Sequence, residues 1–246
     1  MYIQVVYCMA KLKNNRHELI PPCPDPALYI LVKTREGVYW RRKRGTVKKA
    51  RVNNVLAANN AAHKILMPVA SRILKQLEPF TRQLDKGRIT IRLASALLKS
   101  FLEKPRVNYS VLKDLVFQPA YPFDRLLLTS YEVKTEGKQL HLHIDIYKGC
   151  VKAQNKLVTD YYFELILLYG KAWKENSLRI RYAESGLYSY GKEKPGVCTL
   201  SLATAAAHEP WLLLLKLNSL EGKEMAAHPK HYGMKVILTS AGNKVG

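Results

Sequence analysis

Acidic side chains are scarce in this sequence. Asp and Glu number 19 against 40 Lys and Arg, and the formal net charge is +21. Between Glu36 and Glu78 there is no carboxylate at all, although this interval holds ten Lys and Arg. Such an excess of positive charge gives information on a protein's partners and solubility rather than on its fold. The composition therefore predicts an anionic partner.

Cysteine is also rare, and its spacing excludes two classes of small domain. The four cysteines lie far apart without any Cys-x-x-Cys pair. This spacing fits neither a zinc ribbon nor a dense disulfide framework, and it predicts free thiols in a reducing compartment. The four residues are Cys8, Cys23, Cys150 and Cys198.

Long apolar runs are missing as well. An uninterrupted run such as Trp211–Leu215 is far shorter than the ~18 residues that a membrane span requires. At the N-terminus the basic residues follow the apolar run instead of preceding it, and no small-residue cleavage site closes it, which argues against a signal peptide. We therefore expect a cytoplasmic protein that does not enter a membrane.

The spacing of apolar residues changes near the middle of the sequence. In the first half, two β-branched and aromatic runs predict a hairpin over residues 28–42. Apolar residues at three-to-four spacing then predict helices over about 53–77 and 89–104. We expect a basic α/β region over residues 1–124, which ends in an extended, proline-rich linker.

In the second half the hydrophobic period falls to two. Seven strand-like segments separated by turn-rich stretches predict an all-β antiparallel sandwich of about seven strands over residues 125–246, and an α+β class for the whole chain. The segments are RLLLTSYEVK, KQLHLHIDIY, VTDYYFELILLY, SLRIRYA, GVCTLSLAT, WLLLLKL and GMKVILTS.

The functional signal that stands out is a basic segment that begins on the second strand of the hairpin and extends to the first helix. Seven cations lie within eleven residues, next to two aromatic residues that could stack on bases. Clustered cations attract phosphate through counterion release. A surface needed only for solubility normally mixes both signs of charge, and this segment does not. The candidate site for nucleic acid or another polyanion is Tyr39, Trp40, Arg41, Arg42, Lys43, Arg44, Lys48, Lys49 and Arg51.

A structural role fits the same observations. The β-domain, with many of the chain's 15 tyrosines, could assemble into an oligomer through strand edges and aromatic patches. The basic segment would then meet an acidic surface on a neighbouring subunit. The 19 carboxylates of the chain supply few such surfaces, so an assembly with nucleic acid agrees better with the charge than a homopolymer does.

Motifs for catalysis or metal binding each fail a condition. The segment Gly186–Lys192 has the spacing of a phosphate-binding loop, but the next residue, Glu193, stands where Ser or Thr is needed. Alternation along a strand places His141, His143 and Asp145 on one face, which makes them weak candidates for a metal site against the simpler reading of a polar outer face. We therefore expect no cofactor and no enzymatic activity.

Charges on two other strand-like segments suggest a hairpin with cross-strand ion pairs. Asp160 and Glu164 lie on the first segment, and Arg179 and Arg181 lie on the next. Since opposite charges on facing positions of paired strands attract each other, these residues are expected to pair.

Overall fold

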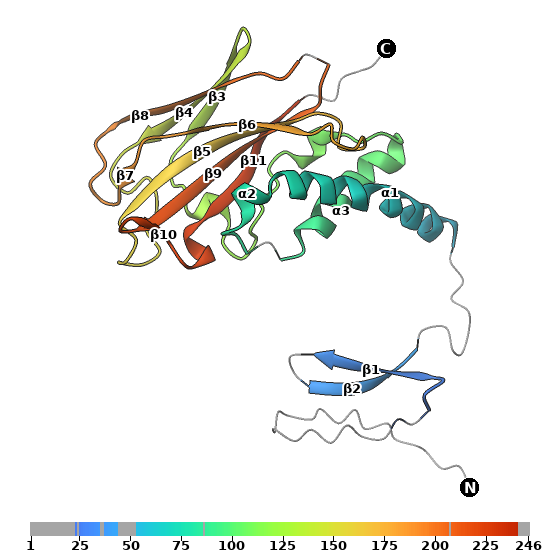
Figure 1. Cartoon of the computed structure of the whole chain (residues 1–246). Helices are drawn as coiled ribbons and strands as arrows, with labels where there is room; N and C mark the ends of the chain where they lie inside the picture. The colour runs from blue at the N-terminus through green and yellow to red at the C-terminus, as the bar shows by residue number, and fades with distance from the viewer. Residues whose placement is uncertain are drawn as a thin grey trace. The chain divides into compact units, whose positions relative to one another are not determined.

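A computed structural model describes residues 23, 25–34, 37–43, 53–85, 87–206 and 208–240. The chain divides into two compact units, Met1–Asn54 and Val55–Gly246. The sequence suggested a domain boundary at residue 124, where the spacing of apolar residues changes, and this position lies inside the second unit. Figure 1 shows the elements of both units.

The first unit contains the predicted hairpin. Strands β1 (Tyr29–Thr34) and β2 (Gly37–Arg42) pair in antiparallel register, with Tyr29 opposite Arg42 and Thr34 opposite Gly37. Valine, isoleucine and aromatic side chains favour this extended conformation because they pack well across a pleated surface.

The second unit combines helices with two antiparallel sheets, which confirms the α+β class. All seven predicted strands of the C-terminal half are present, and two short strands, β7 and β10, accompany them. The helices are α1 (Asn54–Gln76), α2 (Glu78–Thr81) and α3 (Ile89–Glu103), with 3-10 turns η1 (Tyr109–Leu112), η2 (Phe123–Arg125) and η3 (Pro229–His231). The strands are β3 (Tyr131–Glu136), β4 (Gln139–Ile146), β5 (Asp160–Tyr169), β6 (Arg179–Glu184), β7 (Tyr188–Ser189), β8 (Gly196–Ala203), β9 (Trp211–Glu221), β10 (Glu224–Met225) and β11 (Gly233–Thr239).

One sheet has six strands and the other has three. The larger sheet runs β10-β9-β5-β6, with β11 paired to β9 and β7 paired to β5. The smaller sheet runs β3-β4-β8. The two long central strands, β5 and β9, are buried along almost their whole length, which explains why their sequences read as continuous apolar runs instead of alternating ones.

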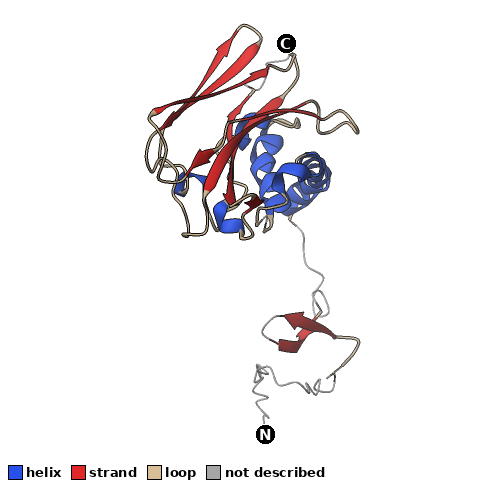
Figure 2. Ribbon diagram, turned by 60° about the vertical axis from the view of Figure 1, so that its left-hand side comes forward, coloured by secondary structure: helices blue, strands red, loops and turns tan. Residues whose placement is uncertain are grey.

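The larger sheet has a core on each of its faces. Alternate residues of β5, such as Phe163 and Leu165, pack with Leu142 and Leu200 of the smaller sheet. The intervening residues, such as Ile166, pack in a second core with the helices. Figure 2 shows the helices gathered on one side of the strands. The second unit therefore has three layers, while the detail of a seven-strand sandwich stays a prediction.

The helices meet the sheet through regular apolar stripes. Buried residues recur on α1 at Leu66, Val69, Ala70 and Ile73, a spacing that places them on one face. The buried residues of α3 follow the same spacing and belong to the same core, and they are Ile89, Leu93, Ala94 and Leu97.

The stretch that reads as a linker is packed into this unit. Gln118 is fully buried, and its side-chain amide donates to the carbonyl oxygens of Pro229 and Tyr232 at 2.8 and 3.2 Å. Its Oε1 accepts a hydrogen bond from the Asp85 amide at 2.8 Å. The expectation of an extended linker at this point is wrong, because Gln118 joins three segments of one core.

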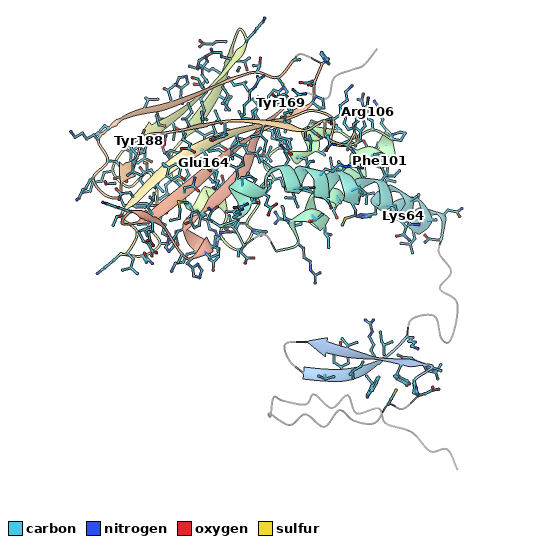
Figure 3. All side chains as sticks on the ribbon, in the orientation of Figure 1. Lys64, Phe101, Arg106, Glu164, Tyr169 and Tyr188 are labelled. Atoms are coloured by element: carbon cyan, nitrogen blue, oxygen red, sulfur yellow. The ribbon has the colours of Figure 1, made fainter. Side chains whose placement is uncertain are left out.

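A buried ion pair joins the two central strands. Glu164 on β5 and Lys216 on β9 are cross-strand partners, and Nζ lies 2.9 Å from Oε2. Their side chains are only 9% and 3% exposed. Burial lowers the pKa of Lys216, and the nearby charge of Glu164 opposes that shift. Figure 3 shows Glu164 among the side chains of the larger sheet.

Neutralising one partner of this pair is expected to destabilise the fold. Glu164→Gln leaves the Lys216 ammonium buried without a counter-charge, so the free energy of unfolding should fall by about 3 kcal/mol. Urea denaturation at pH 7 measures the loss. The control is Glu224→Gln, an exposed residue of β10, whose effect should stay within about 0.5 kcal/mol. Equal losses in both variants would contradict this role of the pair.

Buried tyrosines give the fold a dependence on alkaline pH. Burial raises the pKa of Tyr162, Tyr190 and Tyr232 to about 12. It also raises the pKa of three further tyrosines, Tyr109, Tyr161 and Tyr188, well above the ordinary value of 10.0. The folded protein thus retains phenolic protons that the unfolded chain releases.

Stability should therefore fall as the pH rises from 10 to 12. The unfolded chain loses tyrosine protons near pH 10, and the folded state keeps them, so deprotonation favours unfolding over this range. The lowered pKa of Lys216 acts in the opposite direction, but it concerns one lysine, whereas burial raises the pKa of seven tyrosines when Tyr131 is included. The urea midpoint should be lower at pH 11 than at pH 9, and Tyr162→Phe should reduce that drop. A drop of the same size in the variant would show that Tyr162 does not contribute.

Candidate nucleic-acid interface

Backbone hydrogen bonds close the open end of the hairpin. The Lys43 amide donates to the Leu28 carbonyl at 2.7 Å, one step beyond the last strand pair. The Asp25 carbonyl accepts from the amides of Leu28 and Tyr29, and the Asp25 side chain accepts from the Ala27 amide. The Lys43 ammonium donates to the Pro26 carbonyl at 3.0 Å. Lys43 thus holds the end of the hairpin as well as carrying charge.

The strand register divides the aromatic and basic residues between two faces. Tyr39 lies opposite Val32 and Arg41 lies opposite Ile30, so these four side chains share one face, which we call the Tyr39 face. Ile30 and Tyr39 are 37% and 42% exposed, and Arg41 is exposed too. The Tyr39 face therefore presents an aromatic ring and a guanidinium side by side to solvent.

The opposite face of the hairpin holds Tyr29, Leu31, Trp40 and Arg42. Arg42 is exposed, whereas Trp40 is half-buried. The structure thus brings five of the nine predicted site residues onto or directly beside the hairpin. The other four, Arg44, Lys48, Lys49 and Arg51, lie outside the described residues.

The three weak metal candidates lie on the outer face of β4, as alternation predicts. The rings of His141 and His143 stack with centroids 6.5 Å apart. Each Nδ1 already has a hydroxyl partner on β8, Ser201 at 2.7 Å for His141 and Thr199 at 3.1 Å for His143. Asp145 accepts from Ser130 at 2.8 Å. No group of three or more His, Cys, Asp or Glu that could hold a metal ion occurs in the described part of the chain.

The loop with phosphate-loop spacing forms strand β7 and the turn after it. Glu193, at its end, is 8% exposed, and its two carboxylate oxygens have no hydrogen-bond partner among the described residues. Its charge contributes to the raised pKa values of Tyr161 and Tyr190, so the carboxylate lies close to these rings. A shallow depression of about 690 Å³ opens nearby, with Tyr190 and Gly191 in its wall.

The predicted cross-strand ion pairs between β5 and β6 do not form. The register places Glu164 opposite Glu184, and Arg181 opposite Leu167. Arg181 instead donates to the carbonyls of Ala203 and Thr204 and lies 4.9 Å from the centre of the Tyr169 ring. The sequence showed that the charges were near each other along the chain, but not the register that separates them.

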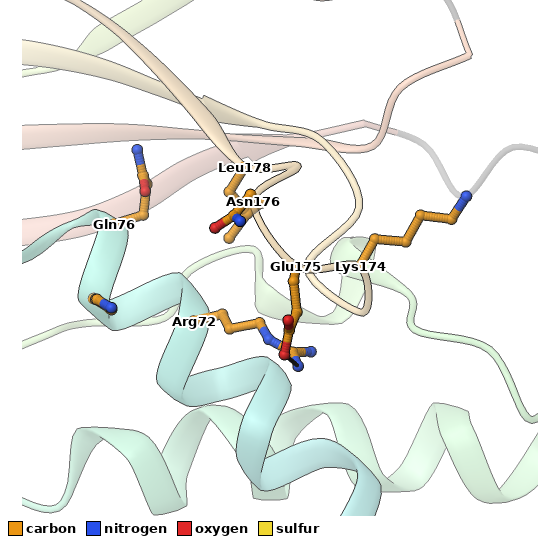
Figure 4. A pocket seen from close by; sticks show the side chains of 7 residues that line it. Arg72, Gln76, Lys174, Glu175, Asn176 and Leu178 are labelled. Carbon is orange, nitrogen blue, oxygen red and sulfur yellow. Dashed lines mark hydrogen bonds and ion pairs between the residues drawn. The ribbon is translucent and has the colours of Figure 1, made fainter.

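A basic cleft in the second unit was missed from the sequence. It measures about 350 Å³ and lies between the end of α1 and the loop after β5. Arg72 spans it and donates to the carbonyl oxygens of Ala172 and Trp173 and, at 3.2 Å, to the Glu175 carboxylate. Figure 4 shows Arg72 and Glu175 pointing toward each other, whereas Lys174 points away from them.

The charges of this cleft are divided between holding the loop and facing solvent. Arg72 is occupied by the loop. Lys75 and Lys174 are exposed, and their ammonium groups have no ion-pair or hydrogen-bond partner within the described ranges. The three-residue spacing of Arg72 and Lys75 places both on one side of α1, but no pattern in the sequence indicates that the distant residue Glu175 would meet them.

Comparison with known proteins yields no relative to guide the assignment. No protein-family model matches the chain, and no curated protein matches it either. Among the residues that the structure describes, no helix is both long enough and apolar enough to cross a membrane. Function must therefore be argued from the geometry.

Replacing Arg72 should loosen the loop after β5. Arg72→Gln removes the bonds to two carbonyls and a carboxylate, which should lower the free energy of unfolding by about 1 to 2 kcal/mol because the site is partly exposed. Chemical denaturation measures this loss. Lys75→Gln, one turn further along the same helix, removes the same charge without a bond and should change stability by less than about 0.5 kcal/mol. If the two variants lose the same stability, Arg72 does not hold the loop.

Proposed function

We propose that this protein binds nucleic acid through the basic segment Tyr39–Arg51 and acts as a binding protein rather than an enzyme. The observation that carries the proposal is the hairpin itself, which exposes Arg41 beside the exposed ring of Tyr39 on one face and Arg42 on the other. These residues open a stretch without any carboxylate that extends to Leu77.

Electrostatics explains why a nucleic acid suits such a surface. Each phosphate that a cation neutralises releases condensed counterions, a gain that does not depend on base sequence. Because no acidic residue follows Glu36 until Glu78, the segment has few charges of its own to neutralise it. An exposed aromatic ring adds a surface on which bases can stack. An acidic protein surface would make no use of such a ring.

Contrast with the second unit supports the same proposal. Several of its cations have structural partners. Lys235 contacts Asp114 at 3.2 Å and Asp124 at 3.1 Å, and Arg72 binds the loop after β5. Arg41 and Arg42 have no such partner among the described residues.

The alternative proposal, a self-assembling subunit, has less support from the strand edges. Edge strand β3 exposes alternating charges at Glu132, Lys134 and Glu136, a pattern that discourages pairing with another chain. The outer edge of β11 is already bonded, since the Val236 amide donates to Leu115 and the Met234 carbonyl accepts from Phe117. An oligomer would have to form through other surfaces.

Binding to a generic DNA duplex should weaken steeply with salt. The slope of log affinity against log salt concentration grows by about 0.9 for each phosphate neutralised. The double variant Arg41→Gln, Arg42→Gln should therefore flatten this slope by about 0.9 for each phosphate that loses its cation. Fluorescence anisotropy on the full chain measures the slope. Adding Arg44→Gln, Lys48→Gln and Lys49→Gln should flatten it further.

A control for total charge comes from the cleft of the second unit. Lys75→Gln with Lys174→Gln removes the same two charges elsewhere and should leave the slope unchanged. An equal change in both double variants would rule out the hairpin as the site. A large ordered oligomer free of nucleic acid, detected by light scattering, would favour the assembly proposal instead.

A further inference from the structure

We infer that the hairpin binds single-stranded nucleic acid, with an unpaired base stacked on the Tyr39 ring and the adjoining phosphate bound by Arg41. This inference rests on the proposed function and names its ligand more closely. It concerns the Tyr39 face alone, which was defined by Ile30, Val32, Tyr39 and Arg41.

The geometry of the Tyr39 face suits one nucleotide of an extended strand. Tyr39 and Arg41 are two residues apart on β2, so their Cα atoms are separated by about 6.8 Å along the strand and both side chains project from the same face. The cross-strand neighbours of this pair, Val32 and Ile30, are aliphatic. A flat apolar surface with a cation at one end therefore faces the solvent.

Exposure shows that the ring is available for a ligand. Tyr39 is 42% exposed, and Ile30, diagonal to it, is 37% exposed. Apolar side chains left in water on a paired strand gain free energy when another flat surface covers them. A nucleobase covers such a ring and adds stacking, which depends little on which base is present.

Chemistry favours a single strand over a duplex. In a duplex the faces of the bases are covered by their neighbours, and a two-stranded ribbon in the major groove reads hydrogen-bonding groups on the base edges. Of the four side chains that define the Tyr39 face, two are aliphatic and one is a ring, and only the Arg41 guanidinium and the Tyr39 hydroxyl can donate to a base edge. Its composition therefore matches stacking on exposed base faces.

The test compares an oligodeoxythymidine with a duplex of equal length, each longer than the roughly 4 to 16 nucleotides that one single-strand-binding fold covers. Both are titrated into the full chain at the same salt concentration. Tyr39→Leu keeps an apolar side chain on the strand but removes the ring. It should weaken binding to the single strand by about 5- to 150-fold, the range found for loss of one stacked base. Binding to the duplex should change by less than about twofold, since phosphate contacts supply nearly all of non-specific affinity.

A second variant separates loss of stacking from damage to the hairpin. Tyr39→Trp retains an aromatic surface, so it should bind the single strand at least as tightly as the natural chain. The new indole should also lose fluorescence when the oligonucleotide is added, because a stacked base quenches it. Arg41→Gln should weaken binding to both nucleic acids, since it removes a cation that binds phosphate.

Each contrary outcome has a distinct meaning. Unchanged single-strand affinity in Tyr39→Leu, with Arg41→Gln still weakening both ligands, would overturn the stacking inference and leave the proposed function standing. Equal weakening of both ligands by Tyr39→Leu, without recovery in Tyr39→Trp, would also overturn it. Failure of the natural chain to bind either nucleic acid at low salt would overturn the proposed function itself.

Discussion

The pairing of β5 with β9 is the interaction on which the second unit depends. Both strands are buried on both faces, and their alternate side chains enter two separate cores. Because one pair of strands supports the helices on one side and the smaller sheet on the other, neither layer has a complete core without it. The same pair contains the buried ion pair between Glu164 and Lys216, so charge is present at the centre of the fold, but it is paired.

Charge has a different role in the two units. In the second unit, buried or half-buried cations meet carboxylates and carbonyl groups, as Lys216, Lys235 and Arg72 do. In the hairpin, Arg41 and Arg42 face solvent, and their stretch of sequence supplies no carboxylate to balance them. This difference explains how a chain with a net charge of +21 can form apolar cores and still present an unbalanced basic surface to a partner.

Hydrophobic period was enough to predict most elements of secondary structure. A helical spacing of apolar residues extends from Leu66 to Ile73, and apolar and polar residues alternate in β4 and β8. Each of these patterns has one period, so the helix and the strands follow directly from the sequence. The packing partners do not, because an apolar stripe shows that a face is buried and not what covers it. For this reason the helices were assigned to a region apart from the strands, whereas they share a core with β5, β9 and β11. Strand register escaped prediction too, as the facing residues Glu164 and Glu184 show.

The candidate site, too, could be predicted from the sequence only in part. The hairpin follows from local patterning, so the sequence sufficed to predict a strand that ends in basic residues. The face that Tyr39 shares with Arg41 came only from the strand register. The cleft at Arg72 depends on a loop about a hundred residues further along the chain, and such non-local interactions leave no periodic signal.

Photochemical crosslinking of the full chain to a single-stranded oligonucleotide, followed by peptide mapping, tests the central claim most directly. The account predicts that the crosslinked nucleotide lies on the peptide containing Tyr39 and Arg41 and that high salt abolishes the crosslink. Crosslinks confined to peptides from residues 55–240, or a yield that does not depend on salt, would contradict it.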